Sequence, residues 1–134
     1  NTTFVNSRRT PKFAWQNLKD NSGPKNSYLD IEETGFEELQ NAIDTHSHIF
    51  VTADSTSMIT EIITRGYFVN VIEMRGPIKK EHHHEIIESF EKKGLLRIVR
   101  LNQLQLSENK FQQNVKDFVV TERDALKSRI LELL

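Results

Sequence analysis

Two short polar turns hold the side chains best suited to bind an anionic ligand. The first is SRRTP, residues 7–11, which follows a β-branched run. The guanidinium groups of Arg8 and Arg9 can bind phosphate oxygens as a fork, so this turn suits a diphosphate. The alternative is that both arginines are solvated surface charges, which is common for paired charges in loops.

The second turn is TADSTS, residues 52–57, between an apolar run and a helical pattern. The first amides of a helix have no partner inside the helix and carry a positive partial charge, so they attract a phosphate. The hydroxyls of Ser55, Thr56 and Ser57 would add donors. Glu61 lies on the same side of the helix as Ser57 and one turn further in, where it could meet a ribose. The alternative is a capping serine and a solvated acid.

The run EHHHE, residues 81–85, is not predicted to hold a metal ion. Consecutive helical residues point about 100° apart, so one ion cannot use all three histidines. A zinc-binding helix needs histidines four residues apart, and that spacing is absent. The sequence also contains no P-loop and no GxGxxG turn, and it identifies no catalytic acid, base or nucleophile.

Composition limits the class of protein. The chain has 134 residues, of which 37% are hydrophobic and 28% charged, with a formal net charge of -1. A nucleic-acid-binding domain usually carries a basic surplus, so no nucleic-acid partner is expected. No apolar run approaches the ~20 residues that cross a bilayer, so no transmembrane segment is expected, whereas peripheral membrane association stays open. The chain begins without Met, and we expect a missing N-terminal domain to precede it.

Strand-like and helix-like patterns alternate along one expected domain, residues 1–134. Strands are expected at residues 2–6, 28–31, 49–52, 67–74 and 95–101. Helices are expected from Pro11 with Thr10 as N-cap, from a Thr34–Glu37 capping box to His46, from Ser57 to Arg65, and over 76–94. Two terminal helices within 107–134 should begin at Ser107 and Thr121. Gly66 and Gly94 are expected to end the helices before them.

The alternation of strands with crossover helices predicts an α/β fold, a three-layer Rossmann-like domain with a parallel sheet. In such sheets ligands bind beyond the carboxyl ends of the strands, where both polar turns lie. The helical patterns also predict the buried side chains. Those expected in the core are Ala14 and Leu18 with Phe13 or Trp15 beside them, then Phe36, Leu39, Ile43, Met58, Ile59, Ile62, Ile63, Ile86, Ile87 and Phe90, with Phe111, Val115, Phe118, Leu126, Ile130 and Leu133 in the terminal helices.

Together the two turns resemble the mitochondrial-fission ELM-like family, in which an SRRTP element precedes a VTxDSxSMxSEAxxTGxPV element. Ser7 to Pro11 match the first element. The second element is matched by Val51, Thr52, Asp54, Ser55, Ser57, Met58, Glu61 and Gly66. The resemblance continues to Gly94, which ends a segment ESFEKKG that is similar to a later family segment.

The resemblance implies the C-terminal half of a GT-B-type glycosyltransferase fold, the half that binds the nucleotide of the sugar donor. It places Glu61 on the ribose and the Ser55–Ser57 segment near the phosphates. The implied nucleotide-binding residues are Ser7, Arg8, Arg9, Asp54, Ser55, Thr56, Ser57 and Glu61. The expected ligand is a nucleoside diphosphate sugar, with no covalently bound cofactor and no metal, and the domain alone should catalyse nothing.

Two other functions stay open. A GT-B-like scaffold that has lost its chemistry would be a non-catalytic interaction module, and eukaryotic members of the family are implicated in recruiting a fission dynamin to mitochondria. A sugar-nucleotide epimerase is a weaker alternative, because the sequence contains neither a GxGxxG turn nor a YxxxK pair. A bacterial member is expected in the cytoplasm, and a eukaryotic one at the mitochondrial surface.

Overall fold

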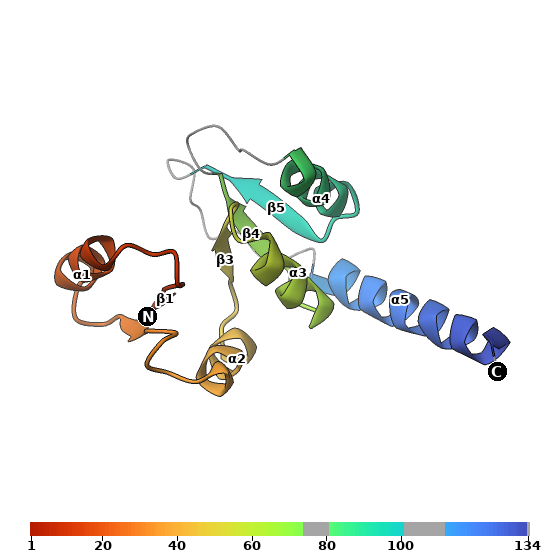
Figure 1. Ribbon diagram of the computed structural model, residues 1–134, viewed down its shortest axis with the longest axis horizontal. Coiled ribbons are helices and arrows are strands. Elements are labelled where there is room, and N and C mark those ends of the chain that lie inside the picture. The colour runs from red at the N-terminus through yellow and green to blue at the C-terminus, as the bar shows by residue number, and fades with distance from the viewer. Residues whose placement is uncertain (74–80, 101–111, 134) are drawn as a thin grey trace. The chain divides into compact units, whose positions relative to one another are not determined.

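Strands and helices alternate along the chain, as Figure 1 shows. The computed structural model describes residues 1–73, 81–100 and 112–133. The chain divides into two compact units, Asn1–Ser47 and His48–Leu134, which are called unit 1 and unit 2 below. Each unit contains a parallel sheet, and each is described by itself.

Unit 1 is a strand–helix–strand motif followed by a second helix. Its two strands are parallel, with Phe4 opposite Tyr28 in the ladder, so the helix between them is the crossover that a parallel pair requires. A glycine with positive φ, Gly23 at 84°, lies in the loop that leads into the second strand. The elements in order are β1 (Thr3–Val5), α1 (Lys12–Asn21), β2 (Ser27–Leu29) and α2 (Phe36–Thr45).

Aromatic side chains join α1 to the two strands of unit 1. Trp15 is buried and packs edge-on against Tyr28, with ring centroids 5.9 Å apart. Phe4 stacks on the same tyrosine, Tyr28, with ring centroids 5.7 Å apart. The prediction that Ala14 and Leu18 face the core is only partly right, because Ala14 is exposed and Leu18 is half-buried. Of the two aromatic residues expected beside them, Trp15 is the buried one, and Phe13 is 78% exposed.

The predicted capping box at the start of α2 is wrong. Gly35 is the N-cap residue, and no side chain makes a capping hydrogen bond there. Thr34 instead donates its hydroxyl to the backbone carbonyl of Asp30 at 2.7 Å, so it closes the turn after β2. The burial prediction for α2 holds for Leu39 and Ile43, whereas Phe36 is 58% exposed.

Unit 2 contains a three-stranded parallel sheet in the order β3–β4–β5, whose strands lie side by side in Figure 1. Val51, Val71 and Ile98 lie opposite one another across it. This pairing and the crossover helices confirm the predicted Rossmann-like α/β class. The elements in order are β3 (Phe50–Thr52), α3 (Thr56–Thr64), β4 (Val69–Ile72), α4 (Glu81–Lys92), β5 (Leu96–Val99) and α5 (Gln112–Leu133).

The core of unit 2 is formed by branched aliphatic side chains of α3 and the sheet. Its fully buried members include Ile59, Ile62, Ile63, Val69, Val71, Leu95 and Val115. Two glycines end the helices that precede strands, as predicted. Gly66 and Gly94 have φ values of 93° and 71°, and the amides that follow them close the helix ends with bonds to earlier carbonyls.

Only part of the apolar stripe predicted to face inward on α4 is buried. Ile87 is buried and Phe90 is half-buried, but Ile86 is 42% exposed. Neighbouring helical positions differ by about 100°, so one helix face cannot bury Ile86 and Ile87 equally. Residues 76–80, which were expected to begin this helix, lie outside the described part of the chain.

The C-terminal segment is one helix, and the prediction of a second helix capped by Thr121 is wrong. Thr121 lies inside α5, where its hydroxyl donates to the carbonyl of Asp117 at 2.9 Å. The first turns of α5 pack in unit 2, since Val115 is fully buried. Three later side chains predicted to be buried are exposed, namely Leu126, Ile130 and Leu133. Ser107 and Phe111 lie outside the described residues.

Candidate functional site

The turn after β1 is closed by its own hydroxyl groups. The Thr10 amide donates to the Ser7 carbonyl at 2.9 Å, and the Ser7 amide donates to the Thr10 hydroxyl at 2.9 Å. The Arg9 amide donates to the Ser7 hydroxyl at 3.3 Å. Thr10 was expected to cap α1, but the N-cap residue is Pro11 and no side chain caps the helix. The hydroxyls therefore hold the turn in shape.

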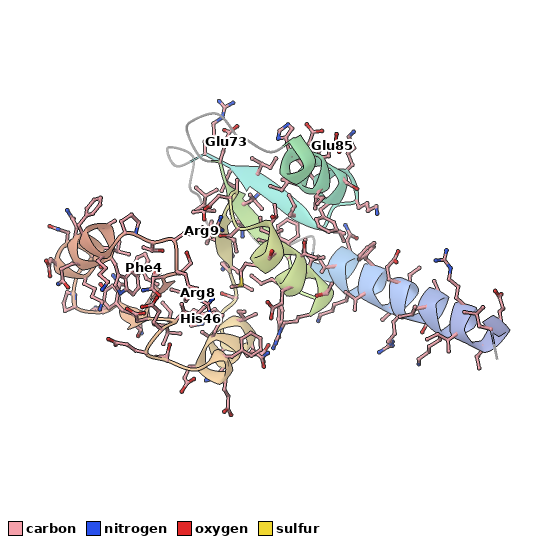
Figure 2. The ribbon with its side chains drawn as sticks, viewed as in Figure 1. Phe4, Arg8, Arg9, His46, Glu73 and Glu85 are labelled. Atoms are coloured by element: carbon pink, nitrogen blue, oxygen red, sulfur yellow. The ribbon has the colours of Figure 1, made fainter. Side chains whose placement is uncertain are left out.

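This closed turn presents two arginine side chains to solvent. Arg8 and Arg9 occupy its two central positions, and both are exposed. Figure 2 labels both side chains on the segment that follows β1. Arg8 makes no hydrogen bond or ion pair within the described residues. A fixed turn with two neighbouring guanidinium groups is suited to bind a phosphate or diphosphate.

The junction of β3 and α3 is closed by backbone bonds alone. The Ala53 amide donates to the Ile72 carbonyl of the neighbouring strand at 3.0 Å. The Ser55 amide then donates to the Thr52 carbonyl at 3.0 Å, and the Ser55 carbonyl accepts the first helical bond from Ile59. Ser55 is the N-cap residue, yet its side chain makes no capping bond. Its hydroxyl is therefore available at a helix start, where amides favour an anion.

The remaining predicted residues of unit 2 surround this helix start. Asp54 is exposed and Thr56 is half-buried beside Ser55, and Ser57 is exposed one position further on. Glu61 is half-buried, four residues beyond Ser57 and therefore on the same side of α3. The Glu61 carboxylate makes no hydrogen bond or ion pair within the described residues.

The predicted site residues thus form two groups. Ser7, Arg8 and Arg9 belong to unit 1 and lie at the carboxyl end of β1. Residues 54–57 and Glu61 belong to unit 2 and lie at or beyond the carboxyl end of β3. Within each unit the group lies where open parallel sheets bind ligands.

Sequence patterns did not identify two charged residues at the same edge of the unit 2 sheet. Glu73 directly follows β4, and Arg100 directly follows β5. Their side chains form an ion pair, with Arg100 Nε 3.1 Å from Glu73 Oε2. The available signal was their position, since each is the first charged residue after a strand.

In unit 1 the turn after β2 contains an acid with a shifted pKa. A side-chain hydrogen bond from Asn6 lowers the pKa of Asp30 below its ordinary value, and the Glu32 amide acts in the same direction from 3.1 Å. Asn6 also accepts the Ile31 amide at 2.8 Å, so it ties the ends of β1 and β2 together. No local sequence pattern predicts this arrangement, because Asn6 and Asp30 are 24 residues apart along the chain.

Neither a cluster of metal-ligating side chains nor a membrane-spanning helix was found among the described residues. Within residues 1–73, 81–100 and 112–133, no group of three His, Asp or Glu side chains is placed to hold a metal ion. His84 of the histidine run lies 2.9 Å from Glu88 instead. No helix in the same part of the chain is long and apolar enough to cross a bilayer.

Comparison with known proteins places most of the chain in a protein family. The family model described as Mitochondrial fission ELM1 matches residues 1–130. No curated protein and no solved structure matches the chain. The match covers both polar turns and all three strands of the unit 2 sheet.

Proposed function

This chain belongs to the mitochondrial fission ELM1 family, and we propose that it binds the nucleoside diphosphate of a sugar donor as part of a GT-B-like glycosyltransferase. In this proposal the phosphates bind at the start of α3 and the ribose hydroxyls meet Glu61. In unit 1, Arg8 and Arg9 are proposed to bind phosphate groups at their own turn.

One observation carries the proposal, namely the helix start that follows β3. It has the positive end of a helix, the Ser55 hydroxyl that no local amide uses, and the Glu61 carboxylate, which has no partner among the described residues, on the Ser57 side of the helix. An anion gains from the first two features. A carboxylate one turn away accepts hydrogen bonds from a diol. A nucleoside diphosphate carries both an anionic diphosphate and a ribose diol.

The proposal is tested by isothermal titration of the intact protein with UDP, GDP and ADP. We expect one of the three to bind and Glu61→Ala to weaken that binding at least about tenfold, since hydrogen bonds to a charged group contribute about 1.5–3 kcal/mol. Glu91→Ala on the exposed side of α4 is the control and should change nothing. Failure of all three nucleotides to bind would refute the proposal.

The non-catalytic interaction module is the second candidate function, and α5 favours it. Leu126, Ile130 and Leu133 form an exposed apolar stripe on this helix, and such stripes commonly bind a partner. The test is the cellular distribution of the intact protein carrying Leu126→Ser with Ile130→Ser. A change in distribution without any change in nucleotide affinity would support an interaction role. An unchanged distribution would remove this candidate.

A further inference from the structure

The carboxyl edge of the unit 2 sheet continues for one residue beyond its strands. The Ala53 amide donates to the Ile72 carbonyl at 3.0 Å, and the Glu73 amide donates to the Val99 carbonyl at 2.9 Å. Neighbouring strands lie about 4.8 Å apart, so Ala53, Glu73 and Arg100 follow one another along the edge at that spacing. Glu73 is therefore beside the turn that begins α3.

The ion pair at this edge is not explained by stability. Glu73 and Arg100 are 49% and 68% exposed, and their side chains meet because they follow adjacent strands. Figure 2 shows Glu73 at the end of β4. Exposed ion pairs contribute little to folding because water and salt screen them. The backbone bond from Glu73 already joins the two strand ends.

The pair offers donors and acceptors together. Arg100 uses only its Nε within the described residues, which leaves its Nη donors available, and Glu73 keeps the lone pairs of Oε1. A sugar hydroxyl both donates and accepts hydrogen bonds, so a carboxylate beside a guanidinium complements two neighbouring hydroxyls. A phosphate would be repelled by the Glu73 carboxylate.

We propose that Glu73 and Arg100 bind hydroxyl groups of the donor sugar. This inference rests on the proposed function and adds a sugar subsite to it. The order along the sheet edge matches the order of groups in the ligand. The diphosphate binds where β3 meets α3, and the hexose lies over the ends of β4 and β5, one and two strands further along.

The test compares each free diphosphate with its sugar conjugate in the intact protein. UDP, GDP and ADP are titrated beside UDP-glucose, GDP-glucose and ADP-glucose. The conjugate should bind about fivefold or more tightly than the free diphosphate, as expected for two added hydrogen bonds. Glu73→Gln and Arg100→Gln should each bring that ratio close to one and leave the affinity for free diphosphate within about twofold. Glu91→Gln is the control and should keep the wild-type ratio.

An exchange variant separates sugar binding from a purely structural pair. Glu73→Arg combined with Arg100→Glu keeps an ion pair but moves the donors and acceptors. We expect it to melt like the wild type and still lack the preference for the conjugate. If the exchange restores the preference, or if both single variants keep it, the sugar subsite is refuted. If the variants weaken binding of the free diphosphate and of the conjugate equally, the pair contacts the ribose and the sugar subsite is also refuted.

The two proposals fail in different ways in this experiment. If the wild type binds no diphosphate and no conjugate, the proposed function is wrong and the sugar subsite is wrong with it. If diphosphate binds and responds to Glu61→Ala while the Glu73 and Arg100 variants keep the wild-type ratio, only the sugar subsite is wrong.

Discussion

The turns after β1 and β3 contain the same kinds of small polar residue but use them differently. In the first turn, the hydroxyls of Ser7 and Thr10 accept hydrogen bonds from local amides. In the second turn, Ser55 begins α3 and its side chain makes no capping bond. A hydroxyl at a strand-to-helix turn is therefore free for a ligand only where no local amide takes it. The first turn offers its arginines to a ligand, and the second offers hydroxyls and amides.

The largest effect is expected from removing the arginines of the first turn. Arg8→Gln with Arg9→Gln should weaken the binding of inorganic pyrophosphate at this turn about a hundredfold, because two charge-assisted contacts are lost at about 1.5 kcal/mol each. Both side chains are exposed, so the melting temperature should stay unchanged. Calorimetric titration measures the affinity, and Lys25→Gln in the following loop is the control. If the affinity is undiminished, the two arginines do not contact the ligand.

The next largest effect is expected from breaking the closure of the first turn. Thr10→Val removes the acceptor of the Ser7 amide and should lower the free energy of unfolding by about 1 kcal/mol. Amide exchange at Ser7, followed by NMR, should become faster. Thr2→Val is the control, since Thr2 is exposed. Unchanged protection of the Ser7 amide would show that the hydroxyl does not hold the turn.

A smaller effect is expected from the matching change in the second turn. Ser55→Ala removes a hydroxyl that makes no capping bond, so the free energy of unfolding should fall by less than about 0.5 kcal/mol, whereas an ordinary capping serine contributes about 1 kcal/mol. Binding of the diphosphate should weaken about fivefold, as for one lost neutral hydrogen bond. Denaturant unfolding and titration measure the two quantities. A larger loss of stability would mean that Ser55 caps α3, and the contrast between the turns would disappear.

The smallest effect concerns how the free energy of unfolding changes at acid pH through Asp30 of unit 1. Hydrogen bonds lower the pKa of Asp30 in the folded state, so its contribution is present above the unfolded pKa, near pH 4, and is lost as pH falls through the folded pKa. Asp30→Asn should lower the free energy of unfolding at neutral pH and flatten its decline below about pH 4, because the variant has no carboxylate to protonate. Melting curves from pH 2 to pH 7 test this. The same steepness in both proteins would contradict it.

The sequence predicted those features of the fold that depend on local pattern. The alternation of strands and helices, the helix ends at Gly66 and Gly94, and the buried isoleucines of α3 are local, and the structure confirms them. Capping was less predictable. Thr10 and Thr34 have a choice of partners, and the three-dimensional turn gives each hydroxyl a different one.

The candidate site was predictable only where one segment contains it. Ser55, Ser57 and Glu61 lie on one helix, so spacing alone placed them together. Glu73 and Arg100 meet through strand pairing, and Asn6 reaches Asp30 in the same way. The register of a parallel pair depends on the packing of its crossover helix, and a single sequence does not state it.

The central claim is that the helix start after β3 binds a nucleoside diphosphate through its phosphates, with Glu61 holding the ribose. The most direct measurement compares inorganic pyrophosphate with the nucleoside diphosphate that binds best, in the intact protein and in its Glu61→Gln variant. We predict that Glu61→Gln weakens binding of the nucleoside diphosphate at least about tenfold and leaves the affinity for pyrophosphate unchanged. Equal affinity of the variant and the wild type for the nucleoside diphosphate would contradict the claim.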